Sequence, residues 1–123
     1  MNRIKLEDLN VNGLVTRFTA IAVEQDDSIF ADDNARYNRL YRQMEDVEGA
    51  LKAQKNDERR ALLPLYDHPN AQVRLKAAIA TLAIAPQAAR RVLQIIIDGE
   101  EYPQAADARG MLRVLDDGTF KPT

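Results

Sequence analysis

Two segments of the sequence, 31 residues apart, follow the same pattern. In each, an apolar stretch ends at an aspartate: residues 62–67 form the first and residues 93–98 the second. The helices expected after them also align, so that Ala77 falls on Ala108. A repeat of this length built from two short helices is typical of an α-solenoid, in which one unit cannot bury its apolar face alone. The C-terminal half is therefore predicted to hold two stacked helical hairpins.

Helices are expected over most of the chain, because glycine and proline, which interrupt helices, each occur only five times in 123 residues. The clearest period lies in residues 34–54, where apolar side chains recur every three or four positions. Pro64 lies inside the third expected helix and should bend it, because a proline in a helix loses a hydrogen bond. The remaining helices are predicted at about 12–25, 57–66, 71–85, 86–98 and 103–117.

Several residues mark where these helices begin and end. Asp32, Asp33 or Asn34 can cap the helix that follows the acidic linker, and Asn70 can cap the helix predicted to start at residue 71. Pro86 suits the first turn of the next helix, where its missing N–H costs nothing. The tail at 118–123 is expected to be extended, with its phenylalanine, Phe120, able to dock back onto the helices.

Residues 62–82 resemble the HEAT repeat. In that repeat a first helix containing proline ends at an aspartate, a Pro/Asn turn follows, and the second helix opens with Val-Arg and then Ala-Ala. The resemblance implies that the aspartate and the arginine hold adjacent units together in a hydrogen-bonded ladder. The second unit departs from the pattern, because no arginine stands at the matching place after Pro103. The matching residues are Pro64, Asp67, Pro69, Asn70, Val73, Arg74, Ala77 and Ala78.

The whole chain also looks like a small bacterial family catalogued as a domain of unknown function. The resemblance implies a HEAT/armadillo-type helical fold and carries no assigned activity. It rests on residues 37–40, 67–70, 72–78, 82–86 and 102–105.

Together these patterns predict an all-α fold of about six helices, a short right-handed HEAT/armadillo-like α-α superhelix. A chain of 123 residues is about the length of one domain, so residues 1–123 are expected to form a single helical-repeat domain. Within it, residues 1–56 hold two N-terminal helices, residues 57–117 hold two HEAT-like hairpins, and residues 118–123 form a tail.

Composition removes several classes of function. Without cysteine the chain has no disulfides, no thiolate metal ligands and no cysteine nucleophile. No apolar run reaches the length of a signal peptide or a membrane span, so the expected location is the cytoplasm, without membrane contact. The net charge of −2 divides evenly along the chain, which gives no overall attraction to nucleic acid.

No catalytic, metal or cofactor residue is expected. His68, the single histidine, lies in a turn beside Pro69 and lacks a second ligand for zinc, so a structural role is favoured. The acidic linker at 24–33 lacks the glycine and the glutamate of a calcium loop, so helix capping explains it better. The carboxylate pairs at 100–101 and 116–117 fall at helix ends, where solvated loop charge is the favoured explanation. The chain has no Gly-rich phosphate loop and no Ser-His-Asp set with a nucleophile elbow.

The favoured hypothesis is a non-enzymatic protein-interaction module that receives a protein or peptide partner on the surface of its second helices. This rests on fold analogy. The residues expected on that surface are Asn38, Gln72, Lys76 and Gln104. The sequence leaves open whether the protein is a monomer or a homodimer that covers the ends of the solenoid.

Nucleic-acid binding is the alternative. Basic residues cluster near the starts of the third, fourth and fifth predicted helices, and stacked repeats would bring them into one stripe along the surface. Arginines in such a stripe would bind the phosphate backbone with an affinity that falls as salt increases. The four arginines of this predicted stripe are Arg59, Arg60, Arg90 and Arg91.

Overall fold

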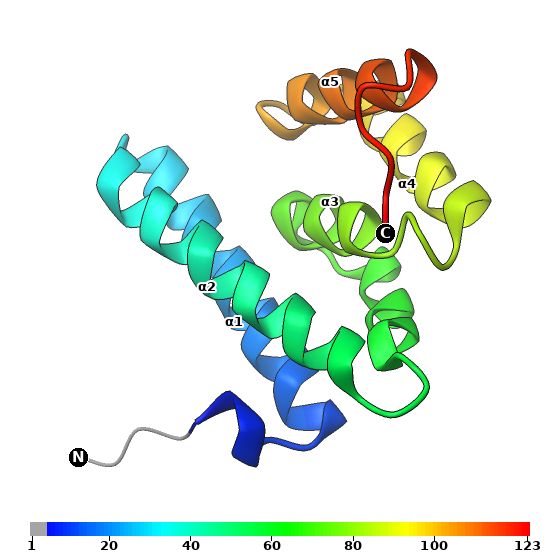
Figure 1. Cartoon of the computed structure of the whole chain (residues 1–123). Coiled ribbons are helices and arrows are strands. Elements are labelled where there is room, and N and C mark those ends of the chain that lie inside the picture. Colours follow the sequence, from blue (N-terminus) through cyan, green and yellow to red (C-terminus); the bar gives the residue numbers. More distant parts are fainter. Residues whose placement is uncertain (1–4) are drawn as a thin grey trace. The chain divides into compact units, whose positions relative to one another are not determined.

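The computed structural model describes residues 5–123, which form helices joined by short turns (Figure 1). No strand occurs in this range, so the prediction of an all-α fold is confirmed. Seven helical elements follow one another: the 3-10 helix η1 (Leu6–Asp8), α1 (Val11–Phe30), α2 (Asn34–Ala53), the 3-10 helix η2 (Glu58–Asp67), α3 (Ala71–Ala80), α4 (Pro86–Asp98) and α5 (Gln104–Asp116).

The chain divides into two compact units, which are described separately below. Unit 1 ends at Ala61 and unit 2 begins at Leu62. The predictions of a single domain and of a superhelix running through both halves stay predictions.

Unit 1 is built on α1 and α2, which lie side by side (Figure 1). Both helices begin at a side-chain cap, as short polar residues at this position usually provide. The Asn10 side chain accepts the N–H of Gly13 at 2.8 Å, and the Asp33 side chain accepts the N–H of Arg36 at 3.1 Å. The buried residues are Leu14, Phe18, Ile21, Ala22, Gln25 and Ser28 on α1, and Leu40, Met44, Val47 and Leu51 on α2.

The first helix is longer than the sequence predicted. It continues to Phe30 instead of ending at residue 25, so most of the predicted acidic linker is helical. Two buried polar residues, Gln25 and Ser28, extend the buried face of α1 beyond residue 22 at helical spacing. The Ser28 hydroxyl donates to the Gln25 carbonyl at 2.7 Å. The turn itself is short, and Asp32 adopts a positive φ of 56° within it.

Unit 2 packs α3, α4 and α5 against one another around a core of aliphatic and alanine side chains. The alanines leave room for the helices to approach closely, while leucine and isoleucine fill the space between them. The 3-10 helix η2 precedes α3 in the sequence. It is attached to the far end of α3 by a hydrogen bond between the Tyr66 hydroxyl and the hydroxyl of Thr81, the residue that follows α3. The core consists of Leu75, Ala78, Leu82, Ala89, Val92, Leu93, Ile96, Ala105 and Ala108.

Two predicted helices differ from those observed. The one expected at 57–66 is a 3-10 helix, η2, and Pro64 lies within it. The helix expected at 71–85 ends at Ala80, because Thr81 leaves the α conformation with a φ of −108° and its N–H donates to the Ala78 carbonyl at 3.2 Å. Residues 81–84 form turns instead, and Pro86 then occupies the first turn of α4, as predicted.

At the C-terminus, α5 ends through Gly118, whose φ of 80° suits glycine better than any other residue. The tail then turns back, and the Phe120 N–H donates to the Val114 carbonyl at 3.0 Å. Phe120 is 38% exposed, so the tail is held by this backbone hydrogen bond and by a partly covered side chain. Among the described helices, none combines the length and the apolar character needed to cross a membrane.

The core of unit 2 gives a test of stability. Leu93 is fully buried on α4, whereas Ile95, two residues further on, is 57% exposed. Leu93→Ala is expected to lower the free energy of unfolding by about 2–5 kcal/mol, because it removes buried methyl groups and leaves a cavity. The matched control Ile95→Ala should change it by less than about 1 kcal/mol. Urea unfolding followed by circular dichroism measures both, and equal losses would contradict the assignment of this face of α4 to the core.

Candidate functional site

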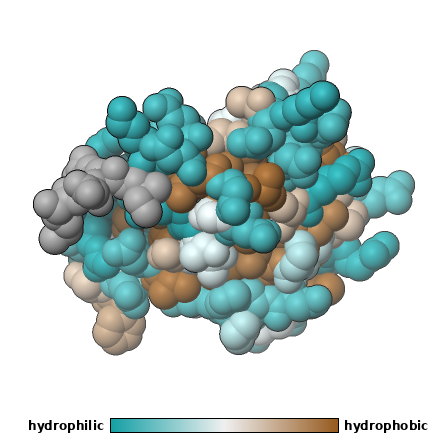
Figure 2. Space-filling view, turned by 90° about the horizontal axis from the view of Figure 1, so that it is seen from below, coloured by the Kyte–Doolittle hydropathy of each residue, from teal (hydrophilic) through white to brown (hydrophobic). Residues whose placement is uncertain are grey.

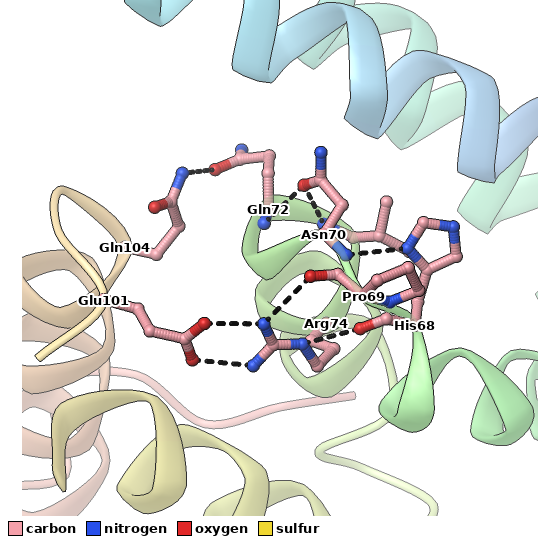
Figure 3. Close-up of polar contacts among 8 residues, drawn as sticks. His68, Pro69, Asn70, Gln72, Arg74, Glu101 and Gln104 are labelled. Carbon is pink, nitrogen blue, oxygen red and sulfur yellow. Dashed lines mark hydrogen bonds and ion pairs between the residues drawn. The ribbon is translucent and has the colours of Figure 1, made fainter. Parts of the chain in front are cut away.

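The turn between η2 and α3 is fixed by its own side chains (Figure 3). The Asn70 side chain caps α3 by accepting the N–H groups of Gln72 at 2.8 Å and Val73 at 3.3 Å. His68 accepts the Asn70 N–H at 3.0 Å through Nδ1. The histidine therefore orders the turn, which supports the structural role predicted for it.

Arg74 joins this turn to the next hairpin. Its Nε donates to the His68 carbonyl at 2.7 Å, and Nη2 donates to the Pro69 carbonyl at 3.3 Å. Both terminal nitrogens also donate to the carboxylate of Glu101, each at 2.7 Å, as Figure 3 shows. The hydrogen bonds from Arg74 hold the pKa of Glu101 below its ordinary value. Glu101 lies between α4 and α5, so the ion pair connects α3 to that turn.

This arrangement corrects the ladder that the HEAT resemblance implied. Arg74 does reach the next hairpin, but its carboxylate partner is Glu101, and Asp67 is exposed. The arginine lies closer to the turn carbonyls than to Asp67, and its remaining donors point toward the α4–α5 turn. The interpretation of residues 100–101 as solvated loop charge is therefore wrong for Glu101.

Two residues of the predicted partner surface are not on the surface. The Gln104 side-chain amide donates to the Gln72 side-chain oxygen at 3.0 Å, and these residues are 3% and 0% exposed. They lie in the first turns of α5 and α3, where this hydrogen bond joins the two buried amides (Figure 3). The other two predicted residues lie on separate units: Asn38 is exposed on α2, and Lys76 is partly buried on α3. The predicted surface is thus wrong for Gln72 and Gln104.

The four arginines predicted to bind nucleic acid differ in their surroundings. Arg59 is 9% exposed, and its Nε and Nη2 donate to the Asp57 carboxylate at 2.9 and 2.7 Å. Arg90 on α4 donates to Asp116 on α5 at 2.9 Å. Arg60 and Arg91 are exposed. Two of the four charges are therefore neutralised by carboxylates, and the stripe stays a prediction.

The surface of unit 2 carries a groove that sequence reasoning missed. It has a volume of about 600 Å³ and lies between α4 and α5. Its floor is apolar, because Ile97 and Leu112 pack on the core with part of their side chains exposed. Its rim is charged. The residues that line it are Gln94, Ile97, Arg109, Leu112, Arg113, Asp116 and Asp117.

Large apolar side chains are exposed at several places in the described chain, and Figure 2 shows hydrophobic residues lying among hydrophilic ones on one face of the molecule. The most exposed is Phe30 at the end of α1, at 95%. Tyr102, before α5, is half exposed, and its hydroxyl accepts a hydrogen bond from Arg109 at 2.7 Å. An aromatic side chain left in solvent is a common element of binding surfaces.

Comparison with known proteins gives the family. The family model described as a domain of unknown function, DUF2019, matches residues 12–116. The chain belongs to this family. It is also similar to the crystal structure of the protein RPA1889 from Rhodopseudomonas palustris CGA009, with 45% sequence identity and a TM-score of 0.93. That match covers 98% of this chain and 100% of the other. No curated protein matches the chain. The prediction of a family catalogued as a domain of unknown function is confirmed.

The Arg74–Glu101 pair gives this DUF2019 domain a dependence of stability on pH. Because the pKa of Glu101 is lowered in the folded state, its contribution to stability is present above the ordinary value of 4.5 and is lost as the pH falls through the folded value. Glu101→Gln should lower stability at neutral pH and make its decline below about pH 5 shallower than in the wild type.

Thermal unfolding at a series of pH values between neutral and acid measures this difference. Glu100→Gln is the matched control, because Glu100 is exposed and forms no ion pair with another described residue. Its curve should run parallel to that of the wild type. A Glu101→Gln curve that also runs parallel would mean that the ion pair is not formed in solution.

Proposed function

We propose that this chain is a non-enzymatic protein-interaction module whose α4–α5 groove binds a peptide with an apolar side chain flanked by carboxylates. The observation that carries the proposal is an apolar floor, Ile97 and Leu112, beside two arginines four residues apart, Arg109 and Arg113. Asp116 and Asp117 also line the rim. The groove is shallow and open to solvent along most of its surface.

The charges that line the groove are balanced, with two arginines and two aspartates, so a carboxylate of the ligand would have to meet the arginines directly. Its two aspartates already have partners: Asp116 accepts from Arg90, and Asp117 accepts the Thr119 N–H at 2.8 Å. Hydrogen bonds from Thr119 also hold the pKa of Asp117 below its ordinary value. Arg113 forms no ion pair within 4 Å in the described chain, and its charge helps to lower the pKa of Asp117.

The two arginines are arranged to act together. Arg109 and Arg113 are four residues apart on α5, so they project from the same face of the helix. The hydrogen bond from Arg109 to the Tyr102 hydroxyl limits the freedom of one guanidinium before any ligand arrives. A pre-positioned guanidinium loses less entropy on binding a carboxylate, which it can hold with two hydrogen bonds.

A nucleic-acid ligand has weaker support. The groove contains as many aspartates as arginines, and backbone binding needs a clustered basic excess. Arg59 and Arg90 are each paired with a carboxylate. The single histidine, His68, accepts a hydrogen bond within its own turn, so no catalytic role is proposed for it.

Peptide binding tests the proposal. A fluorescein-labelled peptide with leucine and phenylalanine between pairs of aspartates should bind the full chain with a Kd between about 10 µM and 1 mM, a range suited to a small groove. Arg113→Glu should weaken binding about tenfold or more, because it removes a charge-assisted pair and adds repulsion. Fluorescence anisotropy measures both.

Two controls isolate the groove. Arg91→Glu reverses an exposed arginine of α4 that does not line the groove, and it should leave the Kd almost unchanged. A peptide in which lysine replaces every aspartate should bind more weakly than the acidic peptide. Equal binding of the two peptides, or equal effects of the two arginine variants, would rule out this site.

A further inference from the structure

We draw no further inference here: the strongest candidate, the acidic turn between α1 and α2 at which Phe30 is 95% exposed, already has Arg36 paired with Glu24 beside it, and nothing in the structure shows what covers the exposed side chain.

Discussion

The arrangement of unit 2 depends on the charged side chain of Arg74. The apolar face of α3 packs Leu75 and Ala78 into the core of unit 2, which holds the helix against its neighbours. Arg74 fixes the turns at the end of this packing, by binding two carbonyls of the preceding turn and the carboxylate of Glu101 in the next. A guanidinium can do this because its five N–H donors lie in one plane, whereas an ammonium has three on a single nitrogen. The charge is also mostly buried, so removing its partner would leave it uncompensated.

Much of the helical pattern could be predicted because it depends on local chemistry. The cap at Asn70 and the proline at the start of α4 act within one turn of their own residue, and both stand where the sequence placed them. The period of α2 follows from one amphipathic face. The predictions that were wrong concern residues whose structure depends on neighbours that are distant in the sequence. Gln25 and Ser28 have the composition of a linker, but they are buried against the hairpin and keep α1 helical to Phe30.

The candidate site was harder to predict than the helices for the same reason. Glu101 lies 27 residues from Arg74, and nothing in its sequence surroundings distinguishes it from its exposed neighbour Glu100. Gln72 and Gln104 are polar residues at helix starts, a position where side chains are usually solvated, yet each satisfies the other in a buried pair. The groove takes its floor from two helices, so no single stretch of sequence contains it.

The even balance of charge concealed how the charged residues are grouped in each unit. A net charge of −2 excludes strong attraction of the whole chain to a polyanion, but it says nothing about how the charges are divided. In unit 1, Asp26, Asp27, Asp32 and Asp33 lie within eight residues, and Arg36 follows them and pairs with Glu24. In unit 2, the groove holds two arginines and two aspartates. At physiological salt, the interaction between exposed charges is largely screened beyond about 8 Å. A ligand that contacts either patch therefore interacts with the charges of that patch and not with the net charge of the chain. Recognition by this chain would therefore be set by each patch separately.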